Sequence, residues 1–217
     1  MILTYCDIEG LQNIFRKNRM LKSAFKSYFN LNDVSGKHSA GKALLLLSMI
    51  LNKTPLNILH TLKYNSYGKP YFSQNAVHFN ISNSHLMSVC CLSIHSEVGV
   101  DIEYQNPDLQ PDDFETVFSL HEIMHLRNSP PREIYKLWTR KESFIKALGL
   151  NLDLNMKRIN TLDDYVIYRN SNWHFTNDNT MPNYQVSICS SEKEECEIVN
   201  LCQNDKIFQS RMHSYDQ

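Results

Sequence analysis

The clearest strand signal lies in residues 98–103, where apolar and acidic residues alternate with a period of two. The valines and the isoleucine point to one face of this predicted strand. Asp101 and Glu103 point to the other face, about 7 Å apart along the strand. Two carboxylates side by side repel each other unless water, a cationic side chain or a metal ion lies between them.

Apolar residues at helical spacing predict one long helix, from about residue 131 to residue 148, with Gly149 ending it. The apolar stripe consists of Ile134, Leu137, Trp138, Phe144, Ile145 and Leu148. Glu142 and Lys146 lie on the opposite, polar side, one turn apart. Lys141 projects into the apolar sector. A lysine there must either extend its hydrocarbon chain so that the ammonium group reaches solvent, or place that group beside an anion.

Elsewhere the pattern predicts helices and short strands in both halves of the chain. The first half carries a compact apolar helix over 41–51 and strands over 77–81 and 88–94. The second half carries strands over 165–168, 173–176 and 184–189. We therefore expect an α+β fold of two similar halves, residues 1–104 and 105–217. Each half packs helices on a small antiparallel sheet, and the active site lies in the cleft between them.

Composition narrows the class of protein. The chain has 217 residues, 42% of them hydrophobic, which is typical of a globular protein with a core. Lys and Arg number 22 against 23 Asp and Glu, so no nucleic-acid surface is expected. The longest apolar run is too short to span a membrane and no signal peptide is apparent, so we expect a cytoplasmic protein. The 6 cysteines form no C-x-x-C pair and are expected to be buried free thiols.

The acidic strand and the long helix together suggest a metal site. Asp101, Glu103 and Glu142 supply three carboxylates from two elements, with Lys146 beside them. Carboxylate oxygens suit a magnesium ion that also holds a substrate phosphate. The plainer alternatives are a solvated acidic pair on the strand and a surface ion pair between Glu142 and Lys146, worth about 0.3–0.5 kcal/mol.

Residues 121–125 offer a competing motif, H-E-x-x-H, the zinc helix of many metalloproteases. In that alternative His121 and His125 bind zinc, Glu122 is the general base, and His174 stays open as a third ligand. Against it, Ser119 and Glu122 form a capping box, which gives Glu122 a structural role at a helix start. The chain contains no P-loop, no G-x-G-x-x-G and no G-x-S-x-G.

Four segments then carry a resemblance to a known family. They are residues 67–70 (Y-G-K-P), 79–84 (F-N-I-S-N-S), 99–103 (G-V-D-I-E) and 138–146 (W-T-R-K-E-S-F-I-K). In this order the segments resemble those of the Sfp-type 4'-phosphopantetheinyl transferases, and the resemblance spans roughly residues 20 to 190. Residues 118–122 (F-S-L-H-E) look like a further family segment, F-S-x-x-E, which gives the H-E-x-x-H match another origin.

The resemblance implies a reaction and its partners. Members of this family transfer phosphopantetheine from coenzyme A to a serine of an apo acyl or peptidyl carrier protein and release 3',5'-ADP. A monomer is implied, and no nucleic acid or membrane is involved. By resemblance, Asp101, Glu103 and Glu142 bind Mg²⁺ with the coenzyme A pyrophosphate. The residues expected to contact coenzyme A are Lys37, Lys69, Pro70, Ser82, Asn83, Lys141 and Lys146.

For catalysis, Glu142 or a metal-held water is the first choice as the base that deprotonates serine, and Glu122 is the second. Lys146 adds fixed positive charge at the phosphates. Asn83 departs from the family, which usually has histidine there. Asparagine donates a hydrogen bond to phosphate but carries no charge. A degenerate relative that binds coenzyme A or a carrier protein without catalysis is the alternative; the three carboxylates and Lys146 argue against it.

Overall fold

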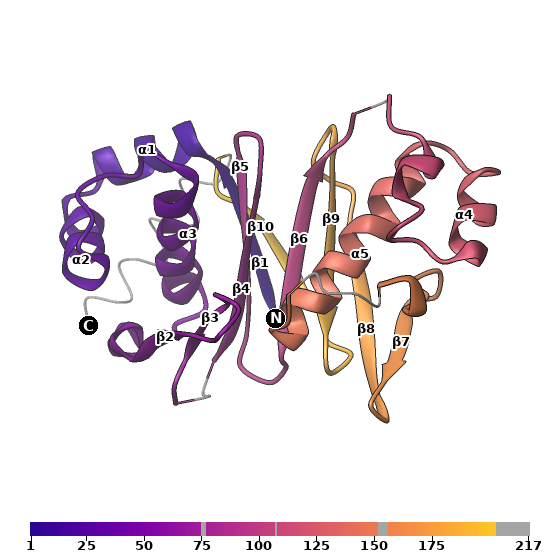
Figure 1. Ribbon diagram of the computed structural model, residues 1–217. Helices are drawn as coiled ribbons and strands as arrows, with labels where there is room; N and C mark the ends of the chain where they lie inside the picture. Colours follow the sequence, from indigo (N-terminus) through magenta and orange to yellow (C-terminus); the bar gives the residue numbers. More distant parts are fainter. Residues whose placement is uncertain (75–76, 107, 152–155, 203–217) are drawn as a thin grey trace. The chain divides into compact units, whose positions relative to one another are not determined.

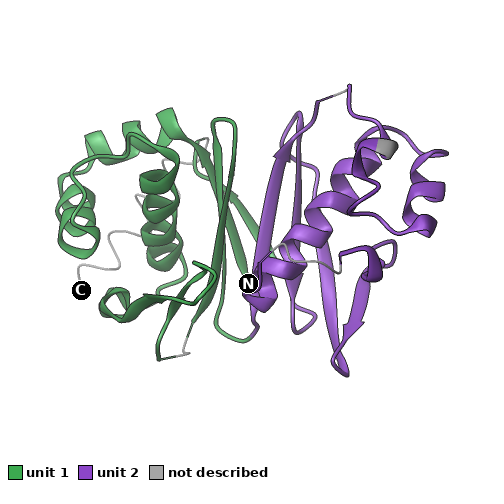
Figure 2. Ribbon diagram, in the orientation of Figure 1, with its two compact units in different colours: residues 1–95, 195–217 green, residues 96–194 purple. Residues whose placement is uncertain are grey.

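The computed structural model describes residues 1–74, 77–106, 108–151 and 156–202. They form two compact units, one made of residues 1–95 and 195–217 and the other of residues 96–194 (Figure 2). This division differs from the predicted boundary after residue 104. Strand β6 pairs within the second unit, whereas the last strand, β10, returns to pair within the first.

The first unit is built on a four-stranded sheet of order β10-β1-β5-β4. The strands are β1 (Ile2–Asp7), β4 (His78–Ser84), β5 (Met87–Ser93) and β10 (Glu197–Asn200). β10 runs parallel to β1, and the other pairs are antiparallel. The sheet is therefore mixed, which corrects the antiparallel prediction. A strand with its partner almost the whole chain away leaves no local sequence signal.

Helix α3 (Lys37–Leu51) covers this sheet (Figure 1). Its apolar run is buried on every side, as expected of a helix enclosed by a core. Two further helices, α1 (Ile8–Lys17) and α2 (Arg19–Phe29), pack on α3. The remaining elements are a 3₁₀ turn, η1 (Leu56–Thr61), and a hairpin of β2 (Leu62–Tyr64) and β3 (Pro70–Phe72).

The second unit has an antiparallel sheet of order β6-β9-β8-β7. The strands are β6 (Val98–Tyr104), β7 (Tyr165–Tyr168), β8 (Ser171–Asp178) and β9 (Tyr184–Ser190). Helix α5 (Arg132–Leu148) packs along β6 and β9 (Figure 1). The shorter elements are η2 (Pro111–Phe114), α4 (Leu120–Leu126) and η3 (Met156–Arg158).

The predicted α+β class is confirmed, with helices packed on small sheets. The likeness of the two halves and the cleft between them stay predictions. The polar side of α5, which includes Glu142, is largely buried, because it packs against β6 and β9. This contradicts the plainer alternative of a surface ion pair between Glu142 and Lys146. Within the described residues, no helix has both the length and the apolar character needed to cross a membrane.

Candidate active site

The approach of α5 to β6 depends on Gly99. A Cβ atom at this position would overlap the carbonyl oxygen of Ser143 and the backbone nitrogen of Ala147, both on α5. Only glycine allows this contact between the two backbones. Because Asp101 lies two residues further along β6, the close approach brings its carboxylate to the helix.

Asp101 and Lys146 meet where these two elements touch. Nζ of Lys146 donates to Oδ1 of Asp101 over 2.6 Å, and the lysine side chain keeps 30% of its surface exposed against 4% for the aspartate. Glu103 is half-buried and its Oε1 accepts from Nε1 of Trp138 over 3.4 Å. The predicted strand and helix residues therefore do come together.

Glu142 completes this group, which we call the acidic cluster: Asp101, Glu103 and Glu142. Oε1 of Glu142 is buried and accepts no hydrogen bond from any described residue. Burial and the charge of Asp101 raise the pKa of Glu142 to about 7; Lys146 opposes the shift and Glu103 adds to it. One lysine therefore does not balance three carboxylates.

A divalent cation suits this surplus of negative charge. Hard oxygen donors are the ligands that Mg²⁺ prefers, and the unsatisfied oxygen of Glu142 is one of them. The three carboxylates are not yet gathered around one point. Among the described residues, the single group whose ligand atoms all lie within 4.8 Å of one another is Cys6, Asp7 and Cys202. Binding one ion through all three carboxylates would therefore require a side-chain rotation.

Lys141 and Glu122 lie in a separate, sealed ion pair. Their charged atoms are 2.9 Å apart, with 1% and 0% of the side chains exposed. Lys141 also donates to the carbonyl oxygens of Met156 and Ile159. Glu122 accepts from the backbone and hydroxyl of Thr161, both over 2.9 Å. Of the two outcomes expected for Lys141, reaching solvent or meeting an anion, the structure shows the second, and the anion belongs to the protein.

These contacts give no support to two of the predicted roles, Lys141 as a coenzyme A contact and Glu122 as a second base. Burial lowers the pKa of Lys141, and Glu122 opposes this shift. The capping box is confirmed, since Ser119 accepts from the backbone of Glu122 and Glu122 accepts from the backbone of Ser119. Lys141 and Glu122 are thus both held in structural contacts.

The zinc alternative loses its general base in this way. Glu122 is enclosed in the cap, while His121 and His125 are exposed on α4. Nε2 of His125 lies 3.9 Å from Glu133, and His174 lies on β8. No group containing these histidines appears among the clusters of metal-ligating side chains in the described part of the chain.

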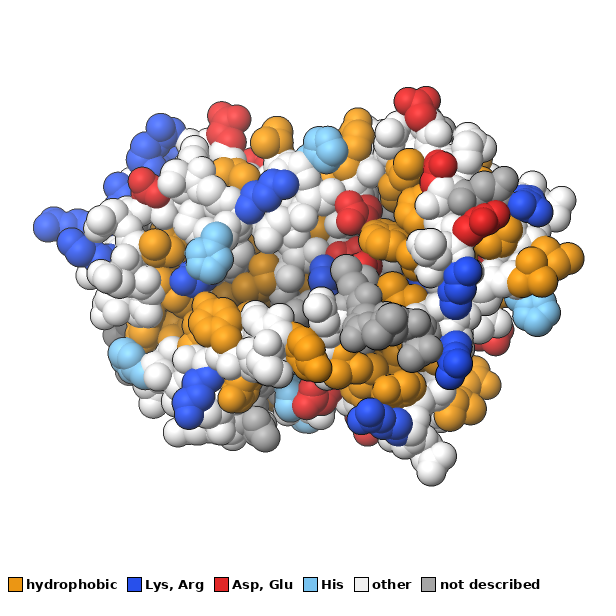
Figure 3. Space-filling model, in the orientation of Figure 1, with side chains coloured by type: hydrophobic (Ala, Val, Ile, Leu, Met, Phe, Trp, Pro, Cys, Tyr) orange, Lys and Arg blue, Asp and Glu red, His pale blue; other side chains and the backbone are white. Residues whose placement is uncertain are grey.

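In the first unit, a cavity of about 190 Å³ gathers some of the residues expected to contact coenzyme A. Lys37, Pro70 and Asn83 line it, whereas Lys69 and the buried Ser82 do not. His38 and Lys42 also line it. Neither residue was predicted to contact a ligand, although their spacing of four residues places them on one helix face. Lys, Arg and His side chains lie among hydrophobic ones over this unit (Figure 3).

Anions suit this cavity because α3 begins at its edge. Lys37 and His38 occupy the first turn of the helix, where backbone N–H groups and the helix dipole favour negative charge. Oδ1 of Asn83 accepts from the hydroxyl of Ser88 over 2.6 Å. The amide NH₂ of Asn83 therefore remains as its donor group, which fits the neutral donor inferred from the sequence.

Arg140 is a further residue that the sequence analysis did not identify. It is buried on α5 and donates to the carbonyl oxygens of Thr161 and Asp163, each over 2.9 Å, and to Asp164 over 2.6 Å. These bonds fix α5 against the segment 161–164. No periodic signal marks these bonds, because the acceptors are two backbone carbonyl oxygens and one aspartate side chain in an irregular segment.

Comparison with known proteins supports the resemblance. Residues 97–196 match the model of the 4'-phosphopantetheinyl transferase superfamily. The chain is 37% identical over 134 residues to the 4'-phosphopantetheinyl transferase gsp of Aneurinibacillus migulanus, covering 59% of this chain and 54% of that one. It is 39% identical over 93 residues to the 4'-phosphopantetheinyl transferase of Bacillus subtilis, covering 41% of each.

A third relative is the 4'-phosphopantetheinyl transferase HetI of Nostoc sp., 28% identical over 124 residues, or 52% of each chain. The chain thus spans about half the length of the curated relatives it matches. The matched region contains the strand and the helix that carry the acidic cluster. The resemblance is therefore confirmed, and two of the four segments that carry it, residues 99–103 and 138–146, lie in the matched region.

Proposed function

We propose that this chain, whose residues 97–196 match the 4'-phosphopantetheinyl transferase superfamily, is itself a phosphopantetheinyl transferase. It transfers 4'-phosphopantetheine from coenzyme A to a serine hydroxyl of an apo acyl or peptidyl carrier protein and releases 3',5'-ADP. The observation that carries the proposal is the buried oxygen of Glu142, unsatisfied beside Asp101 and Lys146.

In this proposal Asp101, Glu103 and Glu142 hold Mg²⁺. The bound ion supplies positive charge that stabilises the pyrophosphate oxygens as the leaving group departs. Lys146 sits at the edge of the cluster with part of its side chain exposed, so it can leave Asp101 and contact a phosphate oxygen. A fixed cation there stabilises the charge that develops on 3',5'-ADP.

Glu142 is proposed to take the serine proton. The pKa of about 7 that burial gives Glu142 applies to the chain without metal, and a bound cation lowers it. With Mg²⁺ held, the carboxylate is ionised and can accept the serine proton either directly or through a water on the ion. The serine oxygen then bonds to the phosphorus that carries pantetheine, and the bond from this phosphorus to the bridging oxygen of the pyrophosphate breaks. Holding the hydroxyl in line with that bond supplies much of the rate enhancement.

The cavity of the first unit is proposed to bind the nucleotide end of coenzyme A. Lys37, His38 and Lys42 offer positive charge or donors for a phosphate, and Asn83 offers a neutral donor. Pro70 and Tyr64 give apolar surface for the adenine. A monomer is proposed because every residue assigned a role lies in one chain.

Intact-mass spectrometry tests the transfer. The chain is incubated with coenzyme A, MgCl₂ and an apo carrier protein, beside Asp101→Asn and beside a sample with excess EDTA. We expect the wild-type chain alone to add one phosphopantetheinyl group to the carrier. If coenzyme A binds with Mg²⁺ but several carrier types gain no mass, the chain is a non-catalytic relative and the proposal is wrong.

A further inference from the structure

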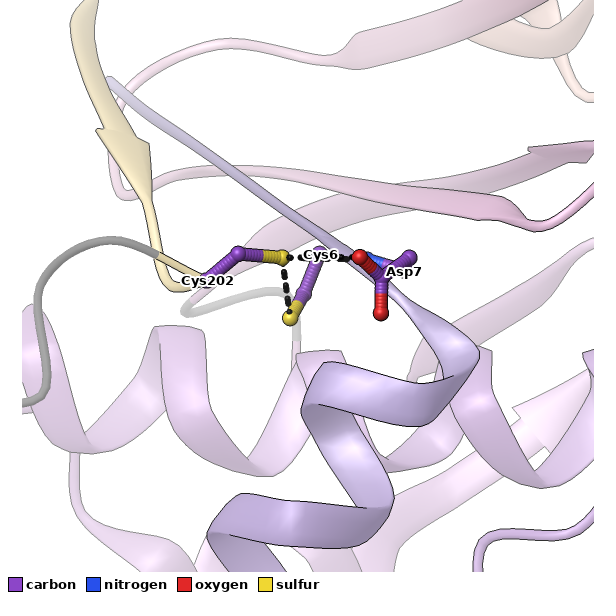
Figure 4. Close-up of side chains that lie close together, drawn as sticks. All are labelled: Cys6, Asp7 and Cys202. Atoms are coloured by element: carbon purple, nitrogen blue, oxygen red, sulfur yellow. Dashed lines mark hydrogen bonds between the residues drawn. The ribbon is translucent and has the colours of Figure 1, made fainter.

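Two cysteines of the first unit lie in contact although 196 positions separate them. The Sγ atoms of Cys6 and Cys202 are 2.9 Å apart, and Asp7 lies beside them (Figure 4). Cys6 is buried on β1, whereas Cys202 follows β10 and is exposed. The exposed Cys202 and half-buried Cys196 correct the expectation that every cysteine is buried. The proposed transfer reaction uses neither member of the pair.

Backbone contacts fix the two thiols in place. The backbone nitrogen of Leu201 donates to the carbonyl of Tyr5 over 3.0 Å, and that of Asp7 donates to Sγ of Cys202 over 3.3 Å. These bonds lie on either side of Cys6 and extend the β1–β10 pairing. Neighbouring strands lie about 4.8 Å apart, within the range of about 4.4–6.8 Å between Cα atoms that a disulfide spans.

Gly10 makes the space that the sulfur atoms occupy. A Cβ atom there would lie 2.7 Å from Sγ of Cys6 and 3.1 Å from Sγ of Cys202. Gly10 belongs to the first turn of α1, a ten-residue helix whose N-cap is Asp7. The positive end of this helix therefore lies next to both thiols.

The surroundings make Cys202 the more reactive thiol. The hydrogen bond with Cys6 lowers the pKa of Cys202, and the same bond, together with burial, raises the pKa of Cys6. The Asp7 carboxylate opposes this lowering of the Cys202 pKa, whereas the backbone N–H of Asp7 donates to Sγ and contributes to it. An exposed thiol whose pKa is lowered, beside a helix N-terminus and in contact with a second thiol, is the arrangement of a redox-sensitive pair.

We propose that Cys202 and Cys6 are a peroxide-sensitive pair that closes into a disulfide joining β1 to the segment after β10. The Cys202 thiolate attacks one oxygen of hydrogen peroxide; the O–O bond breaks, an S–O bond forms, and with one proton the first water leaves. The sulfur of Cys6 then attacks Cys202, the S–O bond breaks and a second water leaves. The two thiols lose two electrons, and one peroxide is reduced to two waters.

Peroxide treatment of the full chain tests this proposal. We expect intact mass to show the loss of two hydrogen atoms, a tryptic digest to yield one peptide pair joined through Cys6 and Cys202, and dithiothreitol to reverse both. The oxidised chain should melt at a higher temperature, because the bond closes a loop spanning 196 positions and restricts the unfolded chain.

Two matched variants show which cysteines form the disulfide. Cys202→Ser should abolish the crosslink, whereas Cys196→Ser, a change in the same terminal segment, should leave it intact. Oxygen added at Cys202 without a crosslink would overturn the proposal. So would a stoichiometric zinc or copper ion that shields both thiols from alkylation in the purified chain, because the pair would then be a metal site.

Discussion

Helix α5 carries two lysines with acidic partners, and the two pairs differ in what surrounds them. Lys141 lies 2.9 Å from Glu122, with neither side chain more than 1% exposed. Lys146 lies 2.6 Å from Asp101, but 30% of its side chain reaches solvent. From sequence alone, both lysines are candidates for binding an anionic ligand.

The balance of charge separates them. In the Lys141 pair one cation meets one anion, and backbone groups and Thr161 satisfy the remaining polar atoms. Around Lys146 one cation faces three carboxylates, and an oxygen of Glu142 remains unsatisfied. A buried ion pair whose charges cancel and whose polar atoms are all hydrogen-bonded holds two elements together. A cluster with surplus negative charge and an unsatisfied oxygen is instead suited to bind a cation.

The largest expected effect comes from removing the surplus charge. Glu142→Gln keeps the shape of the side chain but removes its proton acceptor and its charge. We expect the initial rate of transfer to a carrier protein to fall at least ~100-fold, with the fold retained. The matched control is Glu133→Gln on the same helix, a residue that pairs with Lys136. A Glu142→Gln chain as active as that control would remove Glu142 from the mechanism.

Breaking the sealed pair should act on stability instead. Glu122→Gln leaves the Lys141 ammonium buried without its counter-charge, so the free energy of unfolding should fall by about 3–5 kcal/mol in urea titrations. Transfer activity per folded molecule should stay within about two-fold of wild type, since this pair lies outside the proposed mechanism. Lost activity at unchanged stability would instead restore Glu122 as a base.

The raised pKa of Glu142 gives a pH test of the same comparison. Its folded-state pKa of about 7 exceeds the ordinary value of 4.5, so the folded chain binds the proton more tightly than the unfolded chain. This contribution to stability is present below about pH 4.5 and is lost as pH rises through 7.

Without metal, Glu142→Gln should therefore be more stable than wild type at pH 8, by up to about 3 kcal/mol, and the difference should shrink towards pH 5. Melting temperatures at the two pH values in EDTA measure this difference. A pH-independent difference would place Glu142 in a more solvated environment than the structure shows.

The smallest effect is expected at Asn83. Asn83→His should leave kcat/KM within about three-fold of wild type or raise it, because histidine also donates to phosphate. It should make the KM for coenzyme A more dependent on pH near 6.5, the ordinary pKa of histidine. Ser88→Ala is the matched control, since it frees Oδ1 of Asn83 without adding charge. A large loss in Asn83→His would show that the amide has a further role.

The site residues that were predicted from the sequence are those marked by a pattern within one strand or one helix. Alternation along β6 and helical spacing along α5 identified Asp101, Glu103, Glu142 and Lys146, because both signals repeat within a few residues. The Ser119 cap of α4 was predicted for the same reason. An anion beside Lys141 was one of two expected outcomes, but Glu122 was not identified as that anion, because the two residues lie on different helices.

Long-range contacts account for what the sequence did not show. β10 finds its partner β1 from the far end of the chain, and this pairing brings Cys202 to Cys6. Arg140 binds carbonyl oxygens of an irregular segment, which any residue type supplies. Such contacts follow from the fold and have no periodic signature.

Cation binding tests the central claim, that the acidic cluster beside Lys146 is functional and the Lys141–Glu122 pair is structural. Mn²⁺, which shares oxygen ligands with Mg²⁺, is titrated into the chain with coenzyme A present, and free Mn²⁺ is followed by electron paramagnetic resonance. We predict tight binding in wild type and in Glu122→Gln, and at least ~10-fold weaker binding in Asp101→Asn. Equal binding in Asp101→Asn and wild type would contradict the account.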